Sequence, residues 1–231
     1  ETVHTLFSKK PFVGATMAIS SHLTLLTGIA GINVYIVRIL KLPFDISLHF
    51  YFFFFVGVII TGILKMFFYS SVGAGFLGTL GSSALLYVSI HWIILGNTIN
   101  IPLLYIQGLL LGFGASMTLV SGSMATLLDG DLKEAAQRSQ TMHTIRNFSA
   151  AMLIPIIAYT IKNHIQKGTQ SIYAENITDK MIYLKKLQDV AIDADHQIFL
   201  LMIIFNMVMF VSSIIQMILG KGRRITPPRE S

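Results

Sequence analysis

The polar side chains most able to do chemistry in this sequence lie in one stretch, residues 137–159. It opens with polar and charged residues, contains His143, Arg146 and Asn147, and becomes wholly apolar around Pro155. On a helix, His143 and Asn147 share a face and Arg146 lies beside it. These three are candidate substrate-pathway residues, and Arg146 suits an inner gate or an anionic group. The alternative for Arg146 is that it snorkels to the interface and binds lipid phosphate.

Patterns for covalent or hydrolytic chemistry are missing from the sequence. It has no cysteine, no Gly-rich phosphate loop, no HExxH pair and no GxSxG elbow. The seven histidines are scattered over several helices and loops, and no two of them pair at i, i+4 on a span with an acidic partner. We therefore expect no enzyme activity, no metal and no cofactor.

The composition is that of a membrane protein. Of 231 residues, 53% are hydrophobic and 12% are charged, whereas a soluble domain carries about 25% charged residues. The mean hydropathy is +0.68. The lipid bilayer is therefore the expected partner of most of the surface.

Six apolar segments are long enough to cross a bilayer core of about 30 Å at about 1.5 Å per residue. We expect an all-α membrane protein, a single six-helix domain over 1–231, with spans at 12–37, 46–64, 75–95, 101–128, 139–161 and 198–219. An outside loop at 162–195 and a basic tail at 220–231 complete it. Arg146 is then the only formal charge inside a span, and no span holds Asp or Glu. A charge there must face protein or water rather than lipid.

Further candidate residues lie on two other spans. His22 and Asn33 follow the helical spacing of one face of the first span, and Gln107 adds polarity to the fourth. We expect all three to line the pathway. For His22 and Asn33, interhelical hydrogen bonding alone is the alternative. Trp92, near the end of the third span, suits the membrane–water interface.

Two seams of small residues predict close helix packing. The third span carries Gly75, Gly78 and Ser82 on one face, and the fourth carries Gly108, Gly112 and Ser116 at a spacing of four. Small side chains let membrane helices approach closely.

The distribution of Lys and Arg predicts the topology. The flank before the first span, the turn that holds Lys65, the link before the fifth span and the tail are basic. The opposite short turns hold only Arg38 and Lys41. Because Lys and Arg collect in cytoplasmic loops, we expect both termini in the cytoplasm and the loop at 162–195 outside. The net charge of +6 is thereby read as a topology signal, so no nucleic-acid partner is expected.

With these features placed, the chain resembles the major facilitator superfamily, specifically the end of fourteen-helix drug:proton antiporters of the multidrug efflux type. The resemblance rests on the link with Asp131, Lys133 and Glu134, on Arg-Asn-Phe at 146–148, and on the entry sequence 6–18. A long outside loop, the sequence His-Gln-Ile-Phe at 196–199 and a basic tail complete it.

The resemblance implies one six-helix half of a transporter in a bacterial plasma (inner) membrane, with the N-terminal half elsewhere in the parent chain. The partners would be a hydrophobic or amphipathic small-molecule substrate and protons. The first, second, fourth and fifth helices would line the central cavity, and the third and sixth would face lipid. Proton coupling follows from the family alone, because the usual membrane carboxylates lie in the other half.

The sequence also departs from the family. The loop after the second span keeps only Lys65 and glycines of the usual gating motif. The alternative function is a non-transporting six-span scaffold or assembly protein. That alternative predicts a gene that encodes only this chain, with its own Met a few residues upstream.

Overall fold

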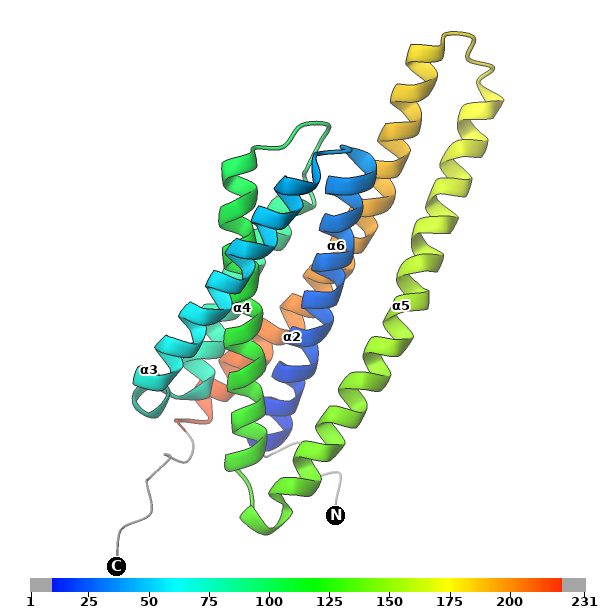
Figure 1. Cartoon of the computed structure of the whole chain (residues 1–231). Helices are drawn as coiled ribbons and strands as arrows, with labels where there is room; N and C mark the ends of the chain where they lie inside the picture. The colour runs from blue at the N-terminus through cyan, green and yellow to red at the C-terminus, as the bar shows by residue number, and fades with distance from the viewer. Residues whose placement is uncertain (1–9, 222–231) are drawn as a thin grey trace, which may run out of the picture.

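A computed structural model describes residues 10–221, with the side chain of Leu132 left aside. The described chain is all-helical and contains no strand. Its elements are α2 (Lys10–Asn33), the π-helical turn η1 (Val34–Ile39), α3 (Phe44–Trp92), α4 (Ile101–Leu128), the 3-10 turn η2 (Leu132–Glu134), α5 (Ala135–Ala174) and α6 (Lys180–Ile218). These five α-helices are long and apolar enough to cross a membrane, and Figure 1 shows them as one elongated bundle.

The expectation of six separate helices is wrong, since the structure has five. The predicted second and third spans both lie in α3, which has 49 residues. Gly73 interrupts it with φ 82° and ψ 170°, a conformation that glycine adopts and other residues avoid. Gly73 lies within the interval 65–74 where the sequence predicted a turn, but the break is a single residue rather than a loop.

The chain reverses direction at Gly73 (Figure 1). Before it, α3 runs parallel to α4, because Phe50 lies against Gly108 and Phe54 lies against Gly112. After it, the two helices are antiparallel, since Trp92 bonds to Gln107 and the later helix end is joined to α4 by residues 93–100.

Lys65 lies within α3 rather than in the turn where the topology prediction put it. Its Nζ donates a 2.8 Å hydrogen bond to the backbone carbonyl oxygen of Ser116. The prediction ended the second span where the first charge occurred. A long lysine stem can follow apolar surface and carry its amine to a backbone acceptor, so the charge did not end the helix.

The prediction of a long loop at 162–195 is also wrong, because most of this segment is helical. The helix α5 continues to Ala174 and α6 already begins at Lys180. The Asp179 carboxylate caps α6 by accepting from the backbone N–H groups of Met181 (2.8 Å) and Ile182 (3.4 Å). The polar composition of residues 162–195 suggested a loop. A helix can nevertheless be polar over most of its surface if one stripe of residues packs against a neighbouring helix.

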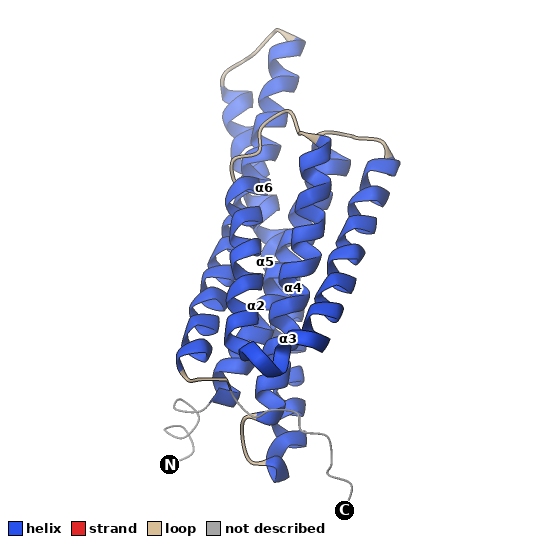
Figure 2. Cartoon of the chain, turned by 90° about the vertical axis from the view of Figure 1, so that its left-hand side faces the viewer, coloured by secondary structure: helices blue, strands red, loops and turns tan. Residues whose placement is uncertain are grey.

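The two arms of the hairpin pack closely. A Cβ on Gly168 would lie 2.5 Å from Val190 Cγ1, and Lys186 forms an ion pair with Glu175. Figures 1 and 2 show the hairpin projecting beyond the other helices.

The two ends of the described bundle lie together, opposite the hairpin. A Cβ on Gly220 would lie 3.7 Å from Lys10 Nζ, and Thr126 Oγ1 donates to the Pro11 carbonyl at 3.3 Å. The tail beyond residue 221 and the entry sequence before residue 10 lie outside the described residues.

The core lies between α2, α3, α4 and α6. Trp92 is fully buried there, with ring centroids 6.3 Å from Phe50 and 5.4 Å from Phe199. Trp92 therefore packs inside the bundle rather than on an outer surface, as an interfacial residue would. Its N–H has a protein acceptor in the core, which removes its need for water.

The small-residue seams lie at these helix contacts. A Cβ on Gly112 would lie 2.0 Å from the Phe54 carbonyl oxygen, and one on Gly75 would lie 2.2 Å from the Met217 nitrogen. Such distances leave no room for a side chain. The remaining seam residues lie as follows: Gly78 against Met17 and Ser213, Gly108 against Phe50, Ser82 fully buried, and Ser116 half-buried.

Candidate functional site

The helix α5, which carries His143, Arg146 and Asn147 of the predicted pathway, is poorly covered by the other described helices. Of its 40 residues only Met142, Leu153 and Ile172 are buried. His143 and Asn147 are exposed, and Arg146 is half-buried. A helix normally buries one stripe against its own fold, so the uncovered polar stripe of α5 can receive another molecule or another domain.

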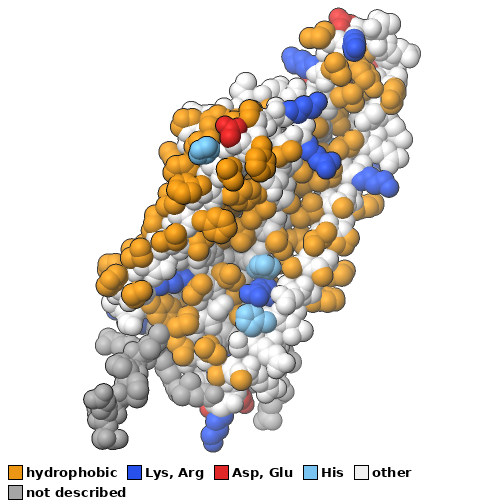
Figure 3. Space-filling view, in the orientation of Figure 1, with side chains coloured by type: hydrophobic (Ala, Val, Ile, Leu, Met, Phe, Trp, Pro, Cys, Tyr) orange, Lys and Arg blue, Asp and Glu red, His pale blue; other side chains and the backbone are white. Residues whose placement is uncertain are grey.

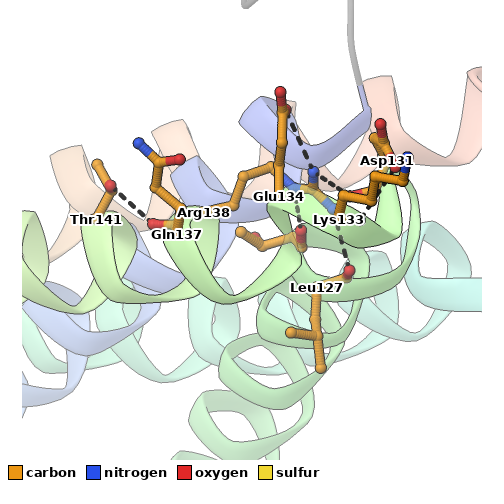
Figure 4. A network of polar contacts seen from close by, with 8 residues as sticks. Leu127, Asp131, Lys133, Glu134, Gln137, Arg138 and Thr141 are labelled. Atoms are coloured by element: carbon orange, nitrogen blue, oxygen red, sulfur yellow. Dashed lines mark hydrogen bonds and ion pairs between the residues drawn. The ribbon is translucent and has the colours of Figure 1, made fainter.

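Arg138 fixes the start of α5 against the end of α4 (Figure 4). Its guanidinium donates to the carbonyl oxygens of Thr126 (3.0 Å), Leu127 (3.2 Å) and Asp131 (2.7 Å). The last carbonyls of a helix lack partners within it, so one side chain satisfies the end of α4 and sets the position of α5. Gly130 gives the room, since a Cβ there would lie 2.6 Å from Arg138 Cζ.

Two of the predicted pathway residues, one on α2 and one on α5, lie within range of an electrostatic interaction. The charge of Arg146 acts on the half-buried imidazole of His22. The Nε atom of Arg146 is buried and has no hydrogen-bond partner among the described residues. Figure 3 shows histidine and basic side chains gathered in the lower half of this face, between apolar surfaces.

Asn33 and Gln107 lie apart from this pair, in contacts between helices. Asn33 Oδ1 accepts a 2.7 Å hydrogen bond from the Tyr51 hydroxyl. Gln107 is 1% exposed. Its Oε1 accepts from Trp92 Nε1 at 2.7 Å, and its Nε2 lies 2.9 Å from His91 Nδ1. Both ends of the Gln107 amide are thus occupied by α3.

The two main cavities lie at the ends of the helices rather than beside Arg146. One, of about 350 Å³, is lined by His91, the turn 94–100, Leu103 and Gln107. The other, of about 260 Å³, lies between Gly75 of α3 and Met217 of α6. Neither pocket is lined by His22 or Arg146.

Comparisons with protein-family models and with curated proteins find no match for this chain. Among the described residues, no three potential metal ligands come together. The candidate site therefore consists of basic and polar side chains on the face of α5 that the other described helices leave uncovered.

Two ionisable residues lie within the apolar helices although the sequence placed them in a turn or loop. One is Lys65, described above. The other is Asp195, which is 1% exposed, and neither of its carboxylate oxygens has a hydrogen-bond partner among the described residues. It lies near the 93–100 turn, where the next residue, His196, contacts the Leu95 carbonyl at 2.7 Å.

The spacing of α6 contained the signal for Asp195. The buried positions of this helix recur at intervals of three and four: Asp195, Phe199, Met202, Asn206, Met209, Ser213 and Gln216. Continuing the same spacing from Phe199 toward the N-terminus of α6 gives position 195, which is Asp195. A hydropathy window alone begins the helix at residue 198 and misses it.

Proposed function

We propose that this chain is one half of a secondary active transporter of the major facilitator type, which exports hydrophobic or amphipathic small molecules by alternating access. In this proposal α3 crosses the membrane twice by turning at Gly73, so the five helices make six crossings. Such transporters place their substrate site near the bilayer midplane, between two repeats.

One observation carries the proposal: the polar face of α5 is left open by the chain. His143 and Asn147 are exposed and Arg146 is half-buried. A charged residue within a membrane helix is expensive when it faces lipid. A second half that closes over this face, leaving an aqueous cavity between the two, would give these residues the surroundings they need.

The outer surface supports membrane insertion. Exposed apolar side chains cover the first part of α3, among them Phe52, Phe55, Ile59 and Ile63, and apolar side chains spread over the face shown in Figure 3. Placement in a bacterial plasma membrane, with both helix-bundle ends in the cytoplasm and the hairpin outside, is part of the proposal, as is proton coupling. Those two features rest on charge distribution and resemblance.

A dye-efflux assay on the parent protein tests the proposal. Cells that express the parent chain should lose an amphipathic dye faster than cells that lack it. Arg146→Ala and Asn147→Ala should each slow this loss, while Gln166→Ala, an exposed residue of the projecting hairpin, should not. Efflux that is unchanged by both α5 substitutions removes this face from the pathway.

A non-transporting scaffold is the second candidate, favoured by the hairpin that projects beyond the other helices. The coding sequence upstream of Glu1 separates the two candidates. A second set of membrane helices encoded there supports the transporter, and a start codon a few residues upstream supports the scaffold.

A further inference from the structure

Basic side chains from different helices lie at one depth of the molecule, near the middle of α4. That helix has 28 residues, so Ala115 and Ser116 lie near its midpoint. Lys65 donates to the Ser116 carbonyl at 2.8 Å, and Ser21 of α2 donates to the Ala115 carbonyl at 2.8 Å. His22 follows Ser21 and therefore shares the depth of Lys65.

Arg146 adds a third basic group from α5. Its charge acts on His22, and its Nε is buried without a hydrogen-bond partner among the described residues. Lys65 is half-buried and has one backbone carbonyl as its acceptor. We call these three residues, Lys65, His22 and Arg146, the mid-depth basic cluster because they share a level along α4 and come from three different helices.

No carboxylate of the described chain lies at this depth. Asp129, Asp131 and Glu134 lie at the end where α4 meets α5, and Asp45 lies in the first turn of α3. The remaining described acids, Glu175, Asp179, Asp189, Asp193 and Asp195, belong to the hairpin side of the bundle. The guanidinium of Arg146 and the amine of Lys65 therefore have no carboxylate partner at this depth among the described residues.

An uncompensated charge at the middle of a membrane helix is costly, and such residues commonly mark substrate or ion pathways. Carboxylates, sulfonates and phosphates offset this cost well, because they accept charge-assisted hydrogen bonds and pair with guanidinium in a bidentate manner. The chemistry of the cluster thus selects an anionic group.

We propose that the mid-depth basic cluster binds the anionic group of the transported molecule, so that the substrates are amphipathic organic anions. This inference rests on the proposed function, since it assigns a substrate class to the same face. The half-buried Leu26 and Ile29 continue the face of α2 beyond His22 and contact the apolar part of the molecule. Asn147, exposed beside Arg146, adds a neutral hydrogen-bonding group.

Two xanthene dyes of opposite charge test the substrate class. Carboxyfluorescein is anionic, whereas rhodamine 123 has the same ring system and is cationic. Fluorescence anisotropy measures the binding of each dye to the purified parent protein in nanodiscs of zwitterionic phosphatidylcholine. Carboxyfluorescein should bind more tightly than rhodamine 123, and Arg146→Gln should weaken its binding by about tenfold, the loss expected from one charge-assisted bond. Lys65→Gln should also weaken it.

Matched variants keep the result interpretable. Arg146→Lys retains the charge and should bind carboxyfluorescein within about threefold of the parent, since it loses only the bidentate geometry. Lys185→Gln removes an exposed lysine of the hairpin and should leave binding unchanged. Circular dichroism and the gel-filtration profile show whether each variant is folded.

Three outcomes would overturn the inference. Rhodamine 123 could bind more tightly than carboxyfluorescein. The folded Arg146→Gln variant could also bind carboxyfluorescein as tightly as the parent, which is expected if carboxylates of the other half neutralise the cluster. The parent could also bind no carboxyfluorescein and instead gain stability from phosphatidylglycerol, which would assign the cluster to lipid phosphate. Proteoliposomes distinguish the two proposals: binding without transport contradicts the transporter but leaves the anion site intact.

Discussion

The amine of Lys65 donates a 2.8 Å hydrogen bond to the carbonyl oxygen of Ser116, near the middle of α4. This contact places a basic side chain deep in the bundle, at the level of His22. Insertion into lipid alone favours an apolar residue at this depth. A lysine there therefore indicates a role beyond membrane insertion. The contact places a basic group at the middle level of the bundle, where the proposed anion site lies.

Lys65→Met should leave the fold stable while it weakens anion binding. Methionine keeps an apolar stem of similar length, and removing a half-buried, uncompensated charge is commonly neutral or stabilising. We expect the free energy of unfolding of the parent protein to change by less than about 1 kcal/mol. Thermal unfolding in detergent micelles measures this change. A loss of several kcal/mol would mean that Lys65 is a structural residue.

Gly112→Ala should destabilise the contact between α3 and α4. A Cβ there would lie 2.0 Å from the Phe54 carbonyl oxygen, and overpacking of this kind costs about 1–3 kcal/mol. Gly62→Ala is the matched control on α3, since nothing lies within 4 Å of its Cβ position. Thermal unfolding should show Gly62→Ala as neutral or slightly stabilised. Equal stability of both variants would contradict the packing.

Gly73→Ala should disturb the reversal within α3. The φ of 82° and ψ of 170° at Gly73 strain any residue with a Cβ, at a cost of about 1–3 kcal/mol. Gly96→Ala, in a turn with open space around its Cβ position, should be tolerated. Protease protection and the yield of folded protein compare the two variants. A Gly73→Ala variant as stable as the parent would place the reversal elsewhere.

Gln107→Leu should destabilise the protein through Trp92 rather than through the pathway. The buried indole N–H would lose its 2.7 Å acceptor, which costs about 1–3 kcal/mol. Adding Trp92→Phe removes the orphaned donor, so the double variant should lose less than the sum of the single losses. A double-mutant cycle by thermal unfolding measures this. Additive losses would mean that the two side chains act independently.

The sequence was sufficient for the helical class, and it located the fourth apolar segment at the same bounds as α4, 101–128. Apolar length identified such segments directly. It placed a turn between residues 64 and 75, but it did not identify Gly73 as the point of reversal, because the break is one glycine conformation and the helix continues past Lys65. It also missed the hairpin, where Asp179 and contacts between the arms support helices of polar composition.

The candidate site of the sequence analysis stays a prediction, since no finding shows that its residues act together. The sequence singled out His22 and Arg146, which the structure brings into electrostatic range, because polar residues in apolar helices are conspicuous. It could not reveal that Gln107 has both amide ends bound to α3. Nor could it show Lys65 at the depth of His22, since that depends on the parallel packing of α3 on α4.

Cysteine accessibility at Asn147 tests the central claim most directly, because the chain has no cysteine of its own. Asn147→Cys is introduced into the parent protein, in which any cysteine of the other half has been replaced by serine. The variant is then treated with a membrane-impermeant thiol reagent. Phe52→Cys, on an exposed apolar surface, is the lipid-facing control. If the polar face of α5 lines an aqueous pathway, Asn147→Cys reacts, carboxyfluorescein slows the reaction, and Phe52→Cys stays unmodified. An Asn147→Cys variant as unreactive as Phe52→Cys would contradict the account.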